Sequence, residues 1–278
     1  MDWLDALILG IVQGLAEYLP ISSSGHLEIC REILGLKMNG ADSLQFDVTL
    51  HVATVLSTIV VLWRQFVPLC TSFFGWKRDS DFYYVLKLLL SCIPVGIVGV
   101  FFKDTIESFF GNGLTVVGIC LCVTALLLSF AYFTTTRPEL LAEKRGIEPR
   151  VKGHDITWWD AFIIGIAQAV AVLPGLSRSG TTIATGILLG DRRDKIATFS
   201  FFMVIIPILG EALLDVKDII KGEDVMGAVG LIPTVVGFLA SFIVGCAACR
   251  WMIELVKKGR LVWFAVYCLA VGITCILW

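Results

Sequence analysis

The chain has 278 residues with a formal net charge of −2, and 57% of its residues are hydrophobic while only 17% are charged. A soluble protein carries about 25% charged residues, so this composition, with a mean hydropathy of +0.85, excludes an ordinary soluble enzyme. The apolar runs are close to the length of about 20 residues that spans a bilayer core. They predict an all-α polytopic membrane protein, for which we expect no nucleic-acid partner. Met1–Asp5 contains two acids and no base, so we expect no cleavable signal.

The first apolar segment, residues 3–35, is interrupted by Pro20 and by three consecutive serines, Ser22 to Ser24. It is predicted to form a helix, a break and a second half-helix. Such a segment is a candidate re-entrant hairpin, because non-helical backbone at membrane depth survives only when it is buried in protein or lines a water-filled cavity.

Three full transmembrane spans follow, predicted at residues 44–66, 81–102 and 113–133. Asp47 and His51 lie four positions apart in the first of these spans. They are either a buried polar pair that joins two helices or a support beneath the polar groups of the first break, Glu17 and His26.

The second half of the chain repeats the first. Residues 3–13 align with residues 158–168, and residues 158–190 form a second interrupted segment. After a one-residue slip, Ser22, Ser24 and Gly25 match Ser177, Ser179 and Gly180, while Ser23 matches Arg178. Three further spans are predicted at residues 194–214, 226–248 and 260–278.

The number of spans decides how the two repeats are related. If neither hairpin crosses the bilayer, each repeat holds three spans, and the second repeat is inverted relative to the first. The sequence therefore predicts one membrane domain built of two inverted repeats, residues 1–155 and 156–278. This domain has six transmembrane helices and two re-entrant helical hairpins, whose breaks meet near the midplane.

Loop charges predict the orientation of the chain. One side of the membrane receives residues 64–80, 134–156, 185–195 and 249–260, which together hold fifteen of the 22 basic residues. The other side receives Arg31, Lys37, Lys103, Lys217 and Lys221. Because short basic loops stay in the cytoplasm, we expect both termini and the cavity of the two breaks to face outward.

The two breaks form the candidate site. A serine-rich break that opens a helix presents free backbone N–H groups and the positive end of a helix dipole, which together bind anions. Two such breaks that face each other predict a phosphate pocket, with the guanidinium of Arg178 as its fixed charge. The breaks are expected to contribute Ser22, Ser24, Gly25, Ser177, Ser179 and Gly180.

The candidate reactive groups belong to the first break. Gln13 and Glu17 share one helix face, and Glu17 is either a base or a ligand for a divalent cation that phosphate oxygens also bind. His26 is either a reactive group, acting as nucleophile, acid or base, or it only forms a hydrogen bond to a neighbouring helix. The three serines supply reactive hydroxyls or cap the half-helix that follows them.

At these residues the chain resembles a known family. The resemblance is carried by Gln13–Glu17, Leu19–His26, Phe46–His51 and Pro174–Thr182. In this order, and along its full length, the chain resembles the BacA/UppP family of undecaprenyl-diphosphate phosphatases. The resemblance implies hydrolysis of a polyprenyl diphosphate lipid, undecaprenyl diphosphate, to undecaprenyl phosphate and inorganic phosphate. It also implies a site at the outer face of the bacterial inner membrane, a Mg²⁺ or Ca²⁺ cofactor, recycling of the lipid carrier for cell-wall synthesis, and resistance to bacitracin.

The resemblance also implies residue roles. The catalytic residues it implies are Glu17, Ser23, His26 and Arg178, and the supporting ones are Gln13, Ser177 and Thr182. This chain has Gln13 where many relatives have Glu, and this glutamine weakens a scheme with two carboxylates on one metal. Two nucleophiles remain open, namely Ser23 activated by His26, or His26 itself.

The sequence is compatible with several alternatives. Inverted repeats with broken helices are also typical of secondary transporters, so a transporter or lipid flippase is the non-enzyme alternative. Small residues between Gly237 and Gly245 pack either within the chain or between two chains, which leaves a homodimer open. The nine cysteines are expected to be apolar filler, and His154 is expected to be solvated in a charged loop.

Overall fold

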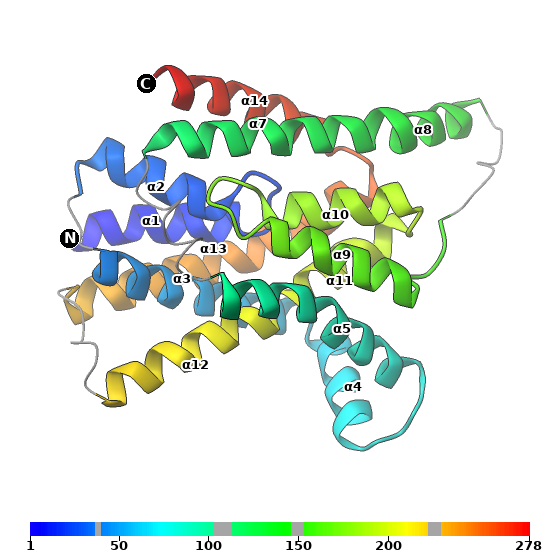
Figure 1. Ribbon diagram of the computed structural model, residues 1–278, viewed down its shortest axis with the longest axis horizontal. Helices are drawn as coiled ribbons and strands as arrows, with labels where there is room; N and C mark the ends of the chain where they lie inside the picture. The colour runs from blue at the N-terminus through cyan, green and yellow to red at the C-terminus, as the bar shows by residue number, and fades with distance from the viewer. Residues whose placement is uncertain (37–39, 103–112, 146–152, 222–228) are drawn as a thin grey trace.

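A computed structural model describes residues 1–36, 40–102, 113–145, 153–221 and 229–278, and within these ranges every regular element is a helix (Figure 1). Four basic residues of the charge count, Lys37, Lys103, Arg150 and Lys152, lie outside the described residues, as do positions 226–228 of one predicted span. The described part of the chain confirms the all-α fold class.

The first interrupted segment consists of helices α1 (Trp3–Ala16) and α2 (Ser23–Leu34). Helix α1 begins at a capping box, in which the Asp2 carboxylate accepts the N–H of Asp5 and the Asp5 carboxylate accepts the N–H of Asp2. The helical hydrogen bonds end around Glu17, and α2 restarts after Ser22. The predicted form of helix, break and half-helix is confirmed.

The second interrupted segment repeats this form in α9 (Trp158–Val170) and α10 (Arg178–Leu189). Its capping box uses Thr157 and Asp160, so the duplication extends to the helix start. In Figure 1, α1 starts and α2 ends at the end of the molecule that holds both termini, whereas α9 starts and α10 ends at the opposite end. The two hairpins therefore point toward each other.

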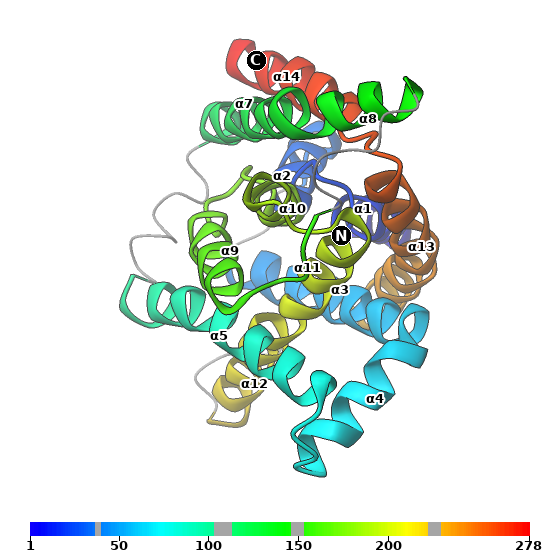
Figure 2. The ribbon, with the colours of Figure 1, turned by 90° about the vertical axis from the view of Figure 1, so that its right-hand side faces the viewer.

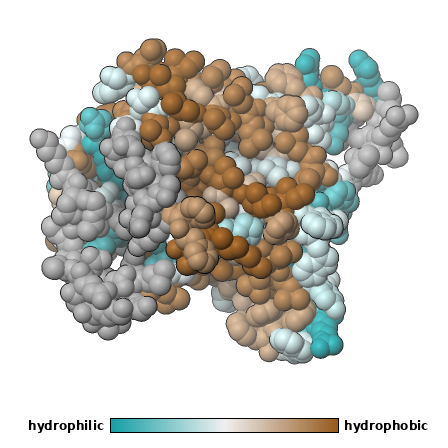
Figure 3. Space-filling model, in the orientation of Figure 1, coloured by the Kyte–Doolittle hydropathy of each residue, from teal (hydrophilic) through white to brown (hydrophobic). Residues whose placement is uncertain are grey.

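Four of the six predicted spans coincide with single helical stretches that are long and apolar enough to cross a membrane. They are α5 (Ser80–Phe101), α7 (Leu114–Ala131) with its continuation through a π-helix (Tyr132–Thr136) into α8 (Arg137–Lys144), α11 (Arg193–Met203) with α12 (Ile205–Lys221), and α13 (Leu231–Lys257). Apolar side chains such as Leu126 and Leu231 are exposed on these helices. Figure 3 shows hydrophobic residues across the middle of one face of the molecule. The chain is a multi-pass membrane protein.

Two predicted spans differ in extent. The span predicted at 44–66 ends early, because α3 (Gly40–Val61) meets α4 (Trp63–Phe74) at a bend of 91°. The residues after the bend, Trp63 to Gln65, are amphipathic or polar and suit the membrane surface better than its core. The last span, α14 (Val262–Leu277), has only 16 residues, about 24 Å of helix against a core of about 30 Å.

Small residues let the hairpins pack closely against the long helices. A side chain at Gly10 would lie 2.4 Å from the carbonyl oxygen of Gly237, and one at Gly14 would lie 2.7 Å from that of Ser241. Small residues of α13 therefore pack against α1 of the same chain, and the homodimer stays a prediction. Figure 2 shows α7 and α14 on one side of the hairpins and α4, α5 and α12 on the other.

Replacing Gly10 with alanine is expected to destabilise the protein by about 1–3 kcal/mol, because the new methyl group overlaps backbone that has no room to retreat. The measurement is thermal unfolding of the detergent-purified protein. Gly96→Ala is the matched control, because a side chain at this exposed α5 glycine would meet no atom within 4 Å. Equal melting temperatures for the two variants would contradict the close approach of α1 and α13.

Candidate active site

The tips of the two hairpins touch in the middle of the molecule. The Ser179 hydroxyl donates a hydrogen bond of 3.1 Å to the carbonyl oxygen of Leu19. An added side chain at Gly25 would lie 3.1 Å from Cα of Gly175, a tight contact that shows how closely the two breaks approach. The predicted meeting of the two breaks is therefore seen directly between residues 160 positions apart.

Serine side chains hold both breaks in shape. Ser22 Oγ accepts the N–H of Gly25 at 3.3 Å, and Ser177 Oγ accepts the N–H of Gly180 at 3.1 Å, so both are helix caps. Ser22 also has φ +71°, a left-handed conformation that is strained for any residue with a side chain. Ser24 only approaches Ser22, at 3.5 Å between the two hydroxyl oxygens.

Glu17 is the centre of the polar cluster. Its Oε2 accepts hydrogen bonds from Ser23 Oγ at 2.8 Å and from Gln13 Nε2 at 2.9 Å. His51 Nε2 lies 3.5 Å from the same oxygen, and the Arg178 guanidinium lies 3.8 Å from Oε1. With 7% of its side chain exposed, the carboxylate is held by one cation and several donors, which stabilise a buried negative charge.

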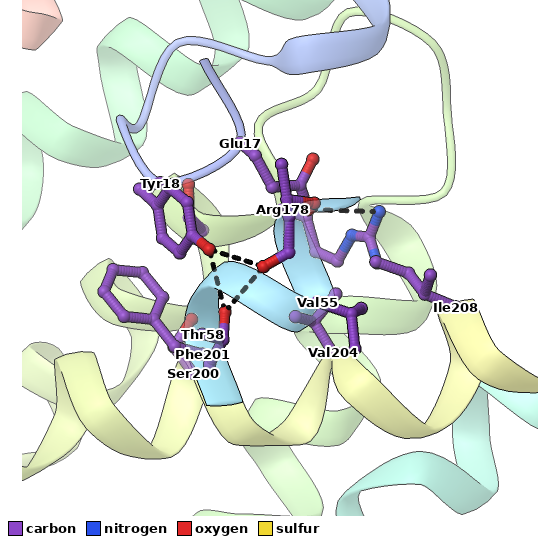
Figure 4. A pocket seen from close by; sticks show the side chains of 11 residues that line it. Glu17, Tyr18, Val55, Thr58, Arg178, Ser200, Phe201, Val204 and Ile208 are labelled. Carbon is purple, nitrogen blue, oxygen red and sulfur yellow. Dashed lines mark hydrogen bonds and ion pairs between the residues drawn. The ribbon is translucent and has the colours of Figure 1, made fainter. Parts of the chain in front are cut away.

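Arg178 brings the second break into this cluster. It is the first residue of α10, and its ion pair with Glu17 joins the two hairpins (Figure 4). The distance of 3.8 Å exceeds that of a hydrogen bond. With 29% of the side chain exposed, its N–H groups therefore retain capacity to bind another anion.

His26 faces a different neighbour. Its Nδ1 lies 2.8 Å from the carbonyl oxygen of Ser22, and its Nε2 lies 2.8 Å from the hydroxyl of Tyr267. Because a carbonyl oxygen only accepts, Nδ1 carries the proton, and the lone pair of Nε2 accepts from Tyr267. The hypothesis of Ser23 activation by His26 needs correction, because the Ser23 hydroxyl instead donates to Glu17.

The predicted pair of Asp47 and His51 is divided between two tasks. His51 supports Glu17, with its Nδ1 held 2.7 Å from the carbonyl oxygen of Asp47. The Asp47 carboxylate instead forms an ion pair with Arg31 of α2. Asp47 therefore acts on the ring of His51 through its backbone, and its side chain ties α3 to the first hairpin.

Other polar residues surround the cluster, and only some of them were predicted from the sequence to belong to the site. Thr182 Oγ1 donates to the carbonyl oxygen of Arg178 at 2.9 Å and lies 2.6 Å from the Ser200 hydroxyl, so it holds the start of α10. Tyr18 donates to the carbonyl oxygen of Thr54 at 2.6 Å. A cavity of about 20 Å³ beneath Glu17 and Arg178 (Figure 4) has room for about one water molecule. Tyr18, Ser200 and Tyr267 carried no sequence signal beyond being polar in apolar helices.

The cluster suits a hard divalent cation. Glu17 supplies one carboxylate, and Gln13 Oε1 is buried with no hydrogen-bond partner among the described residues. Carboxylate and amide oxygens are ligands that Mg²⁺ and Ca²⁺ prefer. With only one carboxylate here, phosphate oxygens would have to complete the coordination, which fits a cation that binds together with a substrate.

The chain matches a known family and several named proteins along almost its full length. The family model for bacitracin resistance protein BacA matches residues 6–274. A protein of Parabacteroides distasonis called undecaprenyl-diphosphatase is 53% identical over 99% of this chain and 98% of its own length. Proteins with the same name from Bacteroides fragilis and Christiangramia forsetii are 52% and 42% identical, over 99% and 100% of this chain and 98% of their own lengths. The chain therefore belongs to the BacA family of bacitracin resistance proteins.

Proposed function

We propose that this chain hydrolyses undecaprenyl diphosphate to undecaprenyl phosphate and inorganic phosphate. The observation that carries the proposal is the cluster at Glu17, where a hydroxyl of the first break and a guanidinium of the second meet one buried carboxylate. Phosphoryl transfer demands mainly positioning and charge neutralisation, and this cluster offers both. The activity returns the lipid carrier to cell-wall synthesis and protects the cell against bacitracin.

The proposed topology has six membrane crossings and two re-entrant hairpins, arranged as inverted repeats of residues 1–155 and 156–278. Three features support it. Both termini lie at one end of the molecule, α8 and the α4–α5 turn lie at the other (Figure 1), and this other end receives most of the basic residues of the sequence. The basic end is then cytoplasmic, and the site opens to the outer side of the bacterial inner membrane.

The lipid tail is proposed to lie in an apolar groove of about 500 Å³ between α5 and α9. The groove is lined by Pro94, Ile97, Val98, Ile166, Ala169, Val170, Val172 and Leu173. Val172 and Leu173 belong to the second break and lie six and five positions before Arg178. A prenyl chain in this groove therefore brings its diphosphate toward the guanidinium and the two half-helix N-termini.

The proposed mechanism proceeds through a covalent phosphoenzyme. Ser23 Oγ attacks the terminal phosphorus in line while its proton passes to Glu17, which already accepts it at 2.8 Å. The phosphoanhydride bond breaks, and undecaprenyl phosphate leaves with the proton that Glu17 received, so that Glu17 is a carboxylate again. Water then attacks the phosphoserine while Glu17 takes its proton. The bond between phosphorus and Ser23 Oγ breaks, Glu17 returns this proton to Ser23 Oγ, and phosphate is released. Arg178 and the N–H groups of both breaks neutralise the charge that develops on the phosphoryl oxygens.

The proposed cofactor is Mg²⁺ or Ca²⁺, held by Glu17 and Gln13 Oε1 together with the substrate. When bound, such a cation neutralises phosphate charge. His26 is placed to hold the first break through Ser22 and α14 through Tyr267. Attack by His26 itself would first require Nε2 to leave the Tyr267 hydroxyl, so Ser23 is the preferred nucleophile.

Hydrolysis is preferred over transport, because the residues of the breaks converge on a carboxylate and a hydroxyl that have no role in carrying a lipid.

The decisive assay is phosphate release from undecaprenyl diphosphate by detergent-purified protein. Arg178→Lys is expected to lower the rate by about 10²-fold, since a lysine keeps the charge but loses the planar fork. The control is Arg250→Lys at an exposed position of α13. No phosphate release, or equal rates for wild type and Arg178→Lys, would contradict the proposal.

A further inference from the structure

A second polar cluster lies at the end of the molecule opposite the termini, away from the Glu17 site. It joins His154, Asp160 at the start of α9, and Asp191 just after α10. His154 Nδ1 lies 3.5 Å from Asp191 Oδ1 and 3.7 Å from Asp160 Oδ2. One potential ligand atom from each residue lies within 4.8 Å of the other two. His154 is solvent-exposed as expected, with 46% of its side chain accessible, but it also lies beside two buried acids.

The Asp191 side chain is fully buried, and neither of its carboxylate oxygens has a hydrogen-bond partner among the described residues. A buried carboxylate without partners is costly unless it is neutral, paired or bound to a metal. Burial, followed by repulsion from Asp160, raises the pKa of Asp191 to about 7. The charge of Lys87 lowers this pKa only as the smallest of the named causes, and its ammonium donates its hydrogen bond to the carbonyl oxygen of Ile156 at 2.6 Å.

The backbone holds the cluster rigidly. His154 N–H donates to the carbonyl oxygen of Gly190 at 2.9 Å, and Arg192 N–H donates back to the carbonyl oxygen of His154 at 3.0 Å. These two bonds fix His154 beside Asp191 across 37 residues of sequence. Asp160 is fixed separately, because its Oδ2 caps α9 by accepting the N–H of Thr157 at 2.8 Å.

We propose that His154, Asp160 and Asp191 bind a divalent transition-metal ion, with Zn²⁺ as the best fit. Bonds of about 2.0–2.2 Å in a tetrahedral zinc site separate the ligand atoms by about 3.4 Å, and the two distances from His154 Nδ1 are 3.5 and 3.7 Å. One imidazole and two carboxylates form a ligand set that zinc accepts. The ion would neutralise the two buried acids and join the start of the second hairpin to its end.

The imidazole has the outer contact that metal-binding histidines commonly make. His154 Nε2 lies 3.2 Å from the carbonyl oxygen of Leu189, which accepts the ring N–H and leaves Nδ1 as the ligand atom. The carbonyl oxygen of Asp155 lies 3.1 Å from Nδ1 and is placed as a further ligand. An imidazolium would donate Nδ1–H to this same carbonyl oxygen, leaving both Asp191 oxygens unpaired.

The test is zinc binding by chelator-treated, detergent-purified full-length protein, measured by equilibrium dialysis and by thermal unfolding. Wild type is expected to bind one Zn²⁺ per chain at micromolar concentration and to unfold at a higher temperature with zinc. Glu17→Gln, which alters the other cation site, and Asp194→Asn, at a neighbouring acid that is ion-paired to Arg192, should behave like wild type. Asp191→Asn and His154→Gln should bind at least about 100-fold more weakly.

Cobalt supplies a readout that does not depend on variant stability. Co²⁺ in wild type should give visible absorption bands of a tetrahedral site, and zinc should displace them. The proposal is overturned if wild type binds no zinc at micromolar concentration, or if Asp191→Asn binds zinc as wild type does. A zinc-insensitive wild type, with Asp191→Asn more stable than wild type, would show that the two acids share a proton.

Discussion

Glu17→Gln should lower kcat for phosphate release by about 10³-fold or more while the protein stays folded. Glutamine has nearly the same shape, so the contacts with Gln13 and Ser23 can survive in altered form. What it loses is the negative charge that accepts the Ser23 proton and balances Arg178. Loss of a positioned base costs about 10²–10⁴-fold, and the unbalanced guanidinium adds to this loss.

The measurement is steady-state hydrolysis of undecaprenyl diphosphate, with kcat and KM determined separately. The control is Glu254→Gln, an exposed acid of α13 that is paired with Lys257 at 3.1 Å. A rise in KM with unchanged kcat would mean that Glu17 only holds substrate or cation. Retention of more than about a tenth of the wild-type kcat would reject Glu17 as the base.

The duplicated parts of the site were predictable from sequence. A serine-rich break repeats in the same place in both halves, so the two hairpins and the meeting of the breaks followed from comparing the chain with itself. Capping by Ser22 was one of two alternatives that the sequence left open. The pairing of Ser23 with Arg178 in that alignment also placed both near one point. In the structure both contact Glu17.

The contacts between distant elements were not predictable in this way. Tyr267 reaches His26 from a helix 241 positions away, and nothing in an apolar helix marks one tyrosine as a partner of a histidine. The spacing of Asp47 and His51 suggested a pair of side chains, but Arg31 competes successfully for the Asp47 carboxylate. His154 looked solvated because its partners, Asp160 and Asp191, become neighbours only when the second hairpin closes.

The bend after α3 shows a similar limit. Hydropathy measures whether a stretch of residues is apolar, but it does not show where the helix axis turns. The predicted span therefore ran past Leu62 into α4, although the two helices meet at 91°. Local composition predicts the presence of an apolar helix better than its end, because the end depends on the surroundings that the residues meet.

Ser23→Ala should lower the rate of hydrolysis by at least about 10⁴-fold, since removal of a nucleophile that acts as a unit with its base leaves only binding and charge stabilisation. It should also abolish a covalent phosphoenzyme. The trapped wild-type adduct should be stable in acid and labile in alkali, as a phosphate ester of serine is. Rapid acid quenching of the protein with substrate labelled in the terminal phosphate measures the amount of adduct. Incubation of the quenched protein in acid and in alkali measures the stability of the adduct.

Ser24→Ala is the matched control, because Ser24 is the next residue of the same half-helix. Among the described residues its hydroxyl has one hydrogen-bond neighbour, the Ser22 hydroxyl at 3.5 Å. It should stay within about tenfold of wild type and still form the adduct, since a weak neutral contact contributes only about 1 kcal/mol. An acid-labile, alkali-stable adduct that persists in Ser23→Ala would identify His26 as the nucleophile. That result would require the imidazole to leave Tyr267 and turn toward Arg178 when substrate binds, so Tyr267→Phe would then accelerate adduct formation rather than leave it unchanged.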